Sequence, residues 1–359
     1  GIGKILLFKY GEHWEPLLNS GFPGSLGNSI NVERDLLCFR EIQTEVVQKH
    51  FTAVDFIIPV LHNNEPSAYV LIGDIDEEGE GMSPLIKHLN FIQTISGIIV
   101  VAIENQRLFQ ESLRQEAVRR ELELAARMQM MLIPDNTRLP SDDTIRARGF
   151  YYPHYEVGGD YYDFMQLSED VIGFCIADVS GKGMSAALLM SNFQASLRAL
   201  FTADAGFTDL IRKLNTLVVT NSAGERFITL FLARYNVKTR VLEYVNAAHN
   251  PPVIINTVTG NSSVLKQSCV GVGMLDEMPC VRTETLQVQN PTKIICYTDG
   301  LSELKDESGM DLGISPLVKH FPNRKPLSDN IDSLISDIDI SAGNSRLFDD
   351  VSILAIEIP

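Results

Sequence analysis

The spacing of apolar and polar residues changes twice along the chain, and each pattern predicts a different kind of structure. In the first ninety residues, short apolar runs bounded by turn residues predict strands over residues 4–10, 54–61 and 68–73. The last two runs flank the turn residues 62–66, so we expect them to pair as a hairpin. Apolar residues at helical spacing predict a helix over residues 34–48.

The second pattern, over residues 91–131, is that of one long helix. It contains no proline and only one glycine, Gly97, and its apolar residues recur every three or four positions. Pro134 ends it. Two interpretations stay open: a single helix packed on its own domains, or a helix that pairs with its copy in a homodimer. We favour the coiled-coil homodimer because one side stays apolar over several turns.

The third pattern, from residue 140 onward, alternates short strands and helices. The strand-like runs are 144–151, 171–178, 227–235, 241–246, 253–256, 293–297 and 351–358, and the helix-like runs are 184–201, 207–221 and 327–338. Many strands joined by tight turns, with few crossovers, favour antiparallel sheets. The fold class predicted from the pattern is α+β.

Composition narrows the classes of partner. The 359 residues carry a net charge of -16, which argues against nucleic acid, because phosphate contacts need clusters of Lys and Arg. The same charge disfavours anionic membrane surfaces. The longest apolar stretch, residues 95–103, is far shorter than the roughly 20 residues that span a bilayer, so no membrane span is expected.

The cysteines and the ends of the chain bear on its location. None of the five cysteines (Cys38, Cys175, Cys269, Cys280 and Cys296) has CxxC spacing, so we expect reduced thiols rather than a zinc site or a redox pair. No secretory signal sequence is present, and the protein is expected to be cytoplasmic. The chain does not begin with Met and leads almost directly into a strand, so we expect it to be part of a longer protein.

Candidate chemistry lies in four acidic sites in the second half of the chain. Asp178 ends an apolar strand, Asp299 follows an apolar run, and the pair Asp349-Asp350 precedes one; the fourth site is Gly158-Gly159-Asp160. Aspartates at strand ends are how a sheet gathers hard oxygen ligands around Mg²⁺ or Mn²⁺. The sequence has no GxxxxGK[ST] loop, GxSxG elbow or HExxH helix, which disfavours nucleoside triphosphatases, α/β-hydrolases and zinc proteases.

The four sites and one further motif stand in an order that resembles the PPM family of metal-dependent protein serine/threonine phosphatases, in its SpoIIE/RsbU-type branch. The branch pattern is E-V-G-G-D-x-x-D, D-V-S-G-(H/K)-G-x-x-A-A, A-G-H-N-P-P, Y-T-D-G-(L/V)-x-E and D-D-(V/M)-(T/S). These motifs stand here at residues 156–163, 178–187, 247–252, 297–303 and 349–352. The resemblance covers roughly residues 120–359. One departure is Ala248, where the family usually has Gly, at a position that is not a metal ligand.

The resemblance implies a β-sandwich flanked by helices, with two Mn²⁺ or Mg²⁺ ions at one edge. By motif, Asp178 would bridge both ions and the carbonyl of Val179 would bind the second. Asp160 would coordinate or orient waters on that second ion, and Asp299 and Asp349 would hold the first. Asp178 and Asp160 are thus the expected catalytic residues, acting on a phosphate monoester through a metal-activated water.

Other residues near these motifs have less defined expected roles. Asp350 is given a supporting role, and Asp163 and Glu303 are expected as outer partners of the ligands. Lys182 is read either as a phosphate-attracting cation or as a solvent-facing side chain. His249 is read either as a catalytic acid or, as we favour, as a structural histidine that bonds to the backbone at a turn.

The N-terminal pattern resembles a GAF-type sensory domain over residues 1–92, without the usual first helix, which is consistent with truncation. Its closing helix is expected to start near Ser83. The acidic loop 74–81 lacks the ligand spacing of an EF-hand, so we favour a solvated turn over a calcium loop. Residues 93–134 are the expected linker and dimer seam, and residues 121–134 resemble the switch region that precedes this phosphatase domain in relatives. Residues 135–359 form the expected phosphatase domain.

Three functional hypotheses follow. The first is a regulated phosphatase whose substrate, as the branch implies, is a phosphorylated STAS-domain anti-anti-sigma factor. The second is an inactive phosphatase-fold scaffold, which the presence of Asp160, Asp178, Asp299 and Asp349 disfavours. The third, compatible with the first, is a sensor of an unidentified small ligand or upstream signal at the GAF-like domain.

Overall fold

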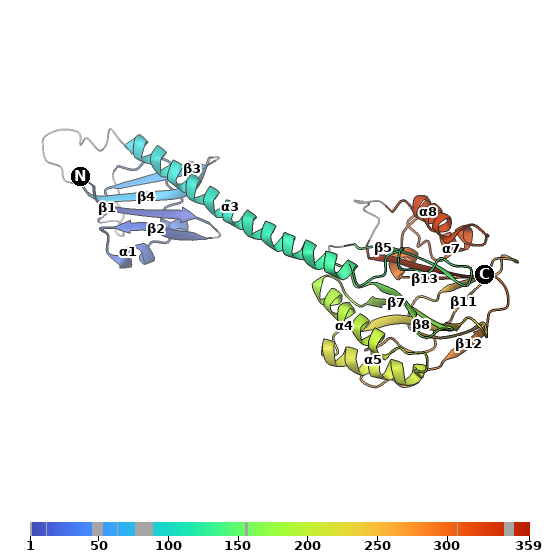
Figure 1. Ribbon diagram of the computed structural model, residues 1–359. Helices are drawn as coiled ribbons and strands as arrows, with labels where there is room; N and C mark the ends of the chain where they lie inside the picture. Colours follow the sequence, from blue (N-terminus) through green and yellow to red (C-terminus); the bar gives the residue numbers. More distant parts are fainter. Residues whose placement is uncertain are drawn as a thin grey trace. The chain divides into compact units, whose positions relative to one another are not determined.

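The computed structural model describes residues 2–11, 13–44, 53–62, 64–75, 89–154, 157–306, 308–340 and 348–359. The chain divides into two compact units, Gly1–Val118 and Arg119–Pro359 (Figure 1). Among the described residues, no helix combines the length and the apolar character needed to cross a bilayer. The acidic loop 76–81 and the expected helix start near Ser83 lie outside the described residues.

The first unit is built on one antiparallel sheet with a core on each face. Its strands are β1 (Ile2–Tyr10), β2 (Trp14–Ser20), β3 (Phe56–His62) and β4 (Glu65–Ile75), in the order β2-β1-β4-β3. Because side chains alternate along a strand, Leu6 and Phe8 join one core while Leu7 joins the other. The short helices α1 (Gly24–Ser29) and α2 (Val32–Asp35) contribute to the first core, and the start of α3 (Leu89–Met130) contributes to the second.

The helix predicted over residues 34–48 was wrong in the residues that the structure describes, which end at 44. Helix α2 stops at Asp35, and Gln43 forms a β-bridge with Ile57 at the edge of the sheet. The apolar spacing was real, since Leu36 is fully buried. Leu36 packs from a turn into the core that Leu6, Phe8 and Tyr69 form on one face of the sheet.

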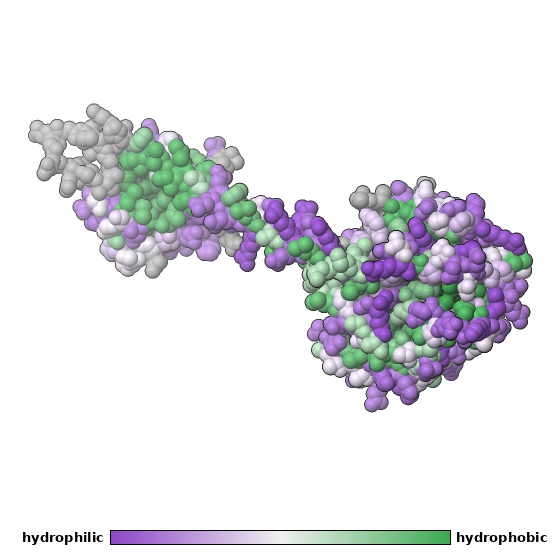
Figure 2. Space-filling view, viewed as in Figure 1, coloured by the Kyte–Doolittle hydropathy of each residue, from purple (hydrophilic) through white to green (hydrophobic). Residues whose placement is uncertain are grey.

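Helix α3 runs for 42 residues and crosses the boundary between the two units. Among the described residues, thirteen large apolar residues of this helix or just beyond its end are exposed. They are Phe91, Ile95, Ile98, Ile99, Val101, Leu108, Phe109, Leu113, Val118, Leu124, Met128, Met130 and Met131. In Figure 2 hydrophobic and hydrophilic residues interleave along the exposed middle of this helix.

The second unit contains two five-stranded sheets. One has the order β12-β9-β8-β7-β6 and the other β11-β10-β13-β14-β5. The strands of the first sheet are β6 (Tyr161–Gln166), β7 (Val171–Val179), β8 (Ile228–Asn236), β9 (Val241–Ala247) and β12 (Glu284–Gln287). Those of the second are β5 (Arg146–Tyr152), β10 (Val253–Asn256), β11 (Ser262–Val264), β13 (Thr292–Tyr297) and β14 (Val351–Ile358). The strand pairs named within both sheets are antiparallel, as predicted.

The two sheets pack face to face, and helices cover their outer faces (Figure 1). Along β13, Ile294 and Cys296 point into the core shared with the first sheet, while Ile295 and Tyr297 point into a second core. That second core is closed by α7 (Ser315–His320) and α8 (Leu327–Ile338). Helices α4 (Met184–Leu200) and α5 (Phe207–Ser222) pack on the first sheet. The mixed helix and sheet class predicted from the pattern is confirmed.

Candidate functional site

The four acidic sites come together because β7 belongs to one sheet and β13 and β14 to the other. Asp178 is the penultimate residue of β7, and Asp160 directly precedes β6, its neighbour in the same sheet. Asp299 opens the short helix α6 (Asp299–Ser302) after β13, and Asp349 lies just before β14. The ends of strands from both layers therefore meet at one edge of the sandwich.

Asp160 is fixed from the opposite sheet. Its Oδ2 accepts hydrogen bonds from Thr298 Oγ1 at 2.7 Å and from Ser352 Oγ at 2.6 Å. The Ser352 backbone N–H donates to Thr298 Oγ1 at 2.9 Å, which fixes that hydroxyl in turn. Asp160 is only 2% exposed, so its carboxylate is held in place by hydroxyl groups rather than by water. Both hydroxyl residues belong to the motifs that carry Asp299 and Asp349.

Asp350 holds the loop that carries Asp160. Its two carboxylate oxygens accept from the backbone N–H of His154 at 2.8 Å and of Gly159 at 2.7 Å. A Cβ on Gly158 would lie 2.3 Å from Asp350 Oδ2, and one on Gly300 would lie 2.0 Å from the Asp350 carbonyl oxygen. These glycines are needed because the backbone segments approach each other closely. The supporting role expected for Asp350 agrees with these contacts.

Beside these groups lies a cavity of about 340 Å³. Asp178, Asp299 and Asp349 line it, together with the D-V-S-G residues Val179, Ser180 and Gly181 and, on the other side, Phe227, Thr229, Ala248, His249 and Asn250. Lys182 Nζ lies 2.8 Å from Asp349 Oδ2 and donates to the Phe348 carbonyl oxygen. Lys182 is therefore paired with an expected ligand and is not simply solvent-facing.

The carboxylates raise one another's pKa values. Burial raises the pKa of Asp178 to about 7, aided by repulsion from Asp299, Asp349 and Asp350 and opposed by Lys182. Burial and repulsion from Asp178 and Asp350 raise the pKa of Asp160 well above its usual range. The pKa of Asp299 is raised by burial, by Asp349 and by Glu303. The expected outer role of Glu303 is consistent with this proximity.

This donor set fits hard divalent cations in its chemistry. It offers carboxylate and carbonyl oxygens around a cavity and carries more negative charge than Lys182 offsets. In the described part of the chain, however, no group of three or more His, Cys, Asp or Glu residues is already arranged to hold a metal ion. Asp349 forms an ion pair with Lys182 instead. The expected ligands therefore lie near one another, but their oxygens do not all point toward one common position.

His249 has its ring bonded on both sides. Nδ1 lies 2.8 Å from Thr229 Oγ1, and Nε2 lies 3.1 Å from the Tyr297 carbonyl oxygen. A carbonyl only accepts, so Nε2 carries the proton and donates. Burial lowers the pKa of His249 to about 4, which keeps the ring neutral. The structural interpretation of His249 is favoured by these bonds. Its neighbour Ala248 has φ +55°, the left-handed region that explains why Gly is usual at this position.

Asp163 is not part of this group. It is fully buried, and its oxygens accept from Arg198 Nε at 2.6 Å, from Arg198 Nη2 at 2.8 Å and from the Tyr161 hydroxyl. The hydrogen bonds described for it tie β6 to α4 and reach none of the four aspartates. We therefore assign Asp163 to a structural ion pair rather than to the outer shell expected from its motif.

Two site-supporting residues lie outside the motifs quoted for the sequence. Arg226 donates to the Ser180 carbonyl oxygen and, at 2.8 Å, to Ser185 Oγ, so its guanidinium holds the turn after Asp178. Gln129, near the end of α3, donates to the Gly158 carbonyl oxygen at 2.6 Å and accepts from the Gly158 N–H at 3.2 Å. A lone Arg before a strand carries no local signal of such a role, whereas Gln129 lies in the segment 121–134 that resembles the switch region.

Comparison with known proteins places this geometry in a family. A family model described as stage II sporulation protein E (SpoIIE) matches residues 168–359. The phosphoserine phosphatase RsbU of Bacillus subtilis is 27% identical over 195 residues, which are 54% of this chain and 57% of RsbU. Protein IcfG of Synechocystis sp. is 26% identical over 340 residues, with coverage of 83% of this chain and 51% of IcfG. The chain thus spans about half the length of the curated relatives it matches.

The fold has solved counterparts as well. The SiaA-PP2C domain of Pseudomonas aeruginosa superposes with a TM-score of 0.57 at 18% identity, covering 68% of this chain and 99% of that domain. At this identity the likeness concerns the fold alone. Because the SpoIIE family model matches more than half of the 359 residues, the protein belongs to the SpoIIE family and has the fold of PP2C-type phosphatase domains.

Proposed function

We propose that the protein is a metal-dependent protein serine/threonine phosphatase that hydrolyses phosphoserine or phosphothreonine on a partner protein. The observation that carries the proposal is the meeting of Asp160, Asp178, Asp299 and Asp349 at one sandwich edge beside a cavity. An inactive scaffold would have no need to keep four carboxylates in mutual repulsion, since burying like charges together costs stability.

Two Mn²⁺ or Mg²⁺ ions would be held by Asp178, Asp299, Asp349, the Val179 carbonyl and Asp160. Bound there, such ions neutralise phosphate charge and make a water nucleophilic at neutral pH. The chain's own contribution is to fix the ligands before substrate arrives. Thr298 and Ser352 orient Asp160, and the clamp by Arg226 holds the turn after Asp178.

Lys182 has a second role in this proposal. Its ammonium group offsets part of the charge of Asp349 and Asp178, two carboxylates that line the cavity. A phosphate group entering the cavity brings negative charge, so the same ammonium group attracts it. We infer that Lys182 gives up its ion pair with Asp349 and binds a phosphoryl oxygen instead when the metal ions and the substrate are bound.

For the substrate, we propose a phosphorylated STAS-domain anti-anti-sigma factor, as the SpoIIE/RsbU-type branch implies. The similarity to a relative named phosphoserine phosphatase supports the chemistry of the phosphoryl group but leaves the partner to be tested.

The test is to incubate the full chain with Mn²⁺ and a panel of phosphorylated STAS proteins. We expect phosphate release that a chelator abolishes and Mn²⁺ restores. Hydrolysis in ¹⁸O-labelled water should place one label in the released phosphate, because water attacks phosphorus, and no phosphorylated side chain should be trapped during turnover. A trapped phosphoenzyme, or release that is indifferent to chelator, would refute the proposed mechanism.

Regulation is proposed to pass through the end of α3. Gln129 bonds both the N–H and the carbonyl of Gly158, two residues before Asp160. A shift of the helix end would therefore move the loop that positions Asp160. The helix is stiff, so a sensory unit at its other end could bias this loop between two arrangements.

The exposed apolar residues of α3 support a homodimer seam over about residues 95–131. Leu113 and Leu124 are 50% and 58% exposed in the single chain, and a second copy would cover them. Substitution of either by Asp should give monomers by light scattering and should change phosphatase activity together with oligomeric state. Gln115→Asp serves as the control, because it introduces the same charge at an exposed position on the opposite side of the helix from Leu113. Dissociation with unchanged activity would rule out the coupling.

For the first unit we propose a GAF-like sensory role. A cavity of about 360 Å³ lies on the α1/α2 side of its sheet, lined by Phe8, His13, Trp14, Pro16, Gly27, Ile30, Asn31, Val32 and Glu33. Its size falls in the range of small-molecule pockets, about 300–1,000 Å³. A ligand there would contact Trp14, the single tryptophan of the chain, so ligand screening can follow its fluorescence.

A further inference from the structure

A second cavity of the phosphatase-like unit lies away from the aspartates and has a different chemistry. Its volume is about 330 Å³, and it shares no lining residue with the cavity beside Asp178. Its wall comes from β5, from the end of β14, from the loop before α8 and from the segment that follows α3. The polar lining residues that matter are Asn136, Arg146, Arg148, Arg324, Ser328 and Glu357.

Three arginines at one cavity stand out in a chain with a net charge of -16. Arg146 is neutralised, since it lies 3.4 Å from Glu357 and 3.2 Å from Asp143. Arg148 and Arg324 form no ion pair or side-chain hydrogen bond with any residue that the structure describes. After the Glu357 charge is assigned to Arg146, the cavity keeps two positive charges that no described residue pairs with.

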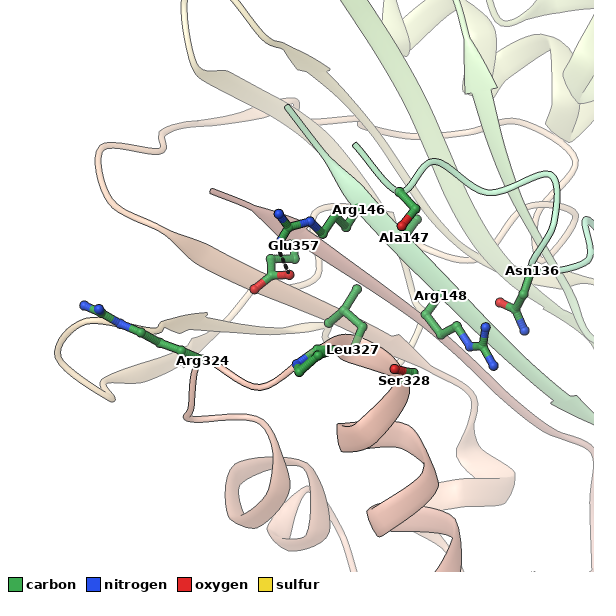
Figure 3. A pocket seen from close by; sticks show the side chains of 10 residues that line it. Asn136, Arg146, Ala147, Arg148, Arg324, Leu327, Ser328 and Glu357 are labelled. Atoms are coloured by element: carbon green, nitrogen blue, oxygen red, sulfur yellow. Dashed lines mark hydrogen bonds and ion pairs between the residues drawn. The ribbon is translucent and has the colours of Figure 1, made fainter. Parts of the chain in front are cut away.

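Figure 3 shows how these charges are placed. Arg148 extends from β5 on the side of the pocket where Asn136 lies, and Arg324 extends from the opposite side, with the start of α8 between them. Arg148 is half-buried, whereas Arg324 is exposed. Leu327 and Ser328, the first two residues of α8, also line the cavity, and the helix N-terminus adds to its positive potential.

We propose that this cavity binds a small phosphate-bearing anion, with Arg148 as its main contact and Arg324 as a rim charge that attracts it. A guanidinium group matches phosphate oxygens with two parallel N–H donors, and pairing of Arg148 would remove an uncompensated charge from a half-buried position. The volume lies at the lower end of small-molecule pockets, which suits inorganic phosphate or a small phosphate monoester.

The site would lie where the segment after α3, strand β5 and the start of α8 meet. Asn136 bonds the Gly149 N–H at 2.8 Å and the Gly149 carbonyl oxygen at 3.0 Å, which anchors the segment after α3 to β5. An anion held between β5 and the start of α8 would add a link from this segment to the helical layer. The proposal does not depend on phosphatase activity, because it concerns other residues.

The test is isothermal titration calorimetry of the full chain with inorganic phosphate, in a chelator so that no divalent cation brings phosphate to the aspartates. We expect binding by the wild-type chain. Arg148→Gln should weaken it by about tenfold, the factor that one charge-assisted hydrogen bond contributes. Arg324→Gln should weaken it by only about threefold, and less in high salt, because exposed charges are screened. Arg212→Gln, which removes an exposed arginine of α5, is the matched control and should bind like wild type.

A parallel titration with adenosine monophosphate identifies the source of the phosphate group. Tighter binding than that of inorganic phosphate points to a phosphate monoester, and weaker binding points to free phosphate. Arg148→Lys keeps the charge but loses the two parallel N–H donors, so its affinity for phosphate should lie between those of the wild type and Arg148→Gln. If Arg148→Gln unfolds, Arg148→Lys takes its place in the comparison. The proposal is overturned if millimolar phosphate gives no heat with the wild-type chain, or if Arg148→Gln and Arg148→Lys bind as tightly as Arg212→Gln.

Discussion

Asp178→Asn should reduce phosphatase turnover by about a thousandfold while leaving the fold intact. Asp178 lies at the penultimate position of β7, lines the cavity and repels Asp299, Asp349 and Asp350, so we expect it to share both of the proposed ions. Loss of about 4 kcal/mol of charge stabilisation corresponds to three powers of ten in rate. Steady-state assays at saturating Mn²⁺ measure the change. Asp276→Asn, an equal charge change at an exposed position of the same unit, should keep wild-type activity.

The pH dependence of the free energy of unfolding, measured in a chelator, tests the raised pKa of Asp178 and shows that Asp178→Asn is folded. The folded-state pKa of Asp178 is raised to about 7, above the value of an unfolded carboxyl group. Folded protein therefore holds this proton more tightly, and stability contributed by Asp178 falls as pH rises from about 4 to beyond 7. Asp178→Asn should lose less stability over that window than Asp276→Asn does. Full turnover in Asp178→Asn would contradict the assignment of the metal ligands.

Arg198→Ala should destabilise the second unit by about 3 kcal/mol. It leaves Asp163, which is fully buried, as a charge without its bidentate partner at 2.6 and 2.8 Å. Breaking a buried pair by removing one partner typically costs about 3–5 kcal/mol, and the half-exposed Arg198 places the expectation at the lower end. Urea unfolding followed by circular dichroism gives the change.

The chain supplies two controls for this prediction. Arg212→Ala removes an exposed arginine from the neighbouring helix and should change stability by less than about 0.5 kcal/mol. Trp14 is the single tryptophan and lies in the first unit, so its fluorescence transition should stay unchanged in Arg198→Ala. Adding Asp163→Asn should recover part of the loss, because no buried charge then remains. No recovery would mean that Arg198 acts through packing alone.

Local patterns were sufficient for the elements that bury a continuous face. The runs predicted at 171–178, 184–201, 253–256 and 327–338 agree closely with β7, α4, β10 and α8. Burial imposes a period on such elements, and the period is readable in the residues themselves. Strands β2, β11 and β12 were missed because their side chains are almost entirely exposed and they are held by pairing at sheet edges. Strand β6 was also missed, although its first three residues are buried.

The positions of the acidic motifs were also local information, since each aspartate follows or precedes an apolar run. Their mutual arrangement was not. Asp160 is bonded by Thr298 and Ser352, which lie 138 and 192 residues further along the chain, and no spacing rule relates residues so far apart. Likewise, the motif that contains Asp160 also contains Asp163, yet side-chain alternation and α4 direct Asp163 to Arg198 instead.

The sequence by itself determined the chemical character of this protein: hard oxygen ligands at strand ends, a long helix with an apolar side, and a strongly acidic surface. The tertiary structure alone decided which groups meet. It brought strand ends of two face-to-face sheets together beside the cavity, bonded Gln129 to the loop of Asp160, and placed Arg148 and Arg324 at a second cavity where no described residue pairs with them. The physical reason is that secondary structure follows from short-range periodicity, whereas a site is made by contacts between elements that only packing brings together.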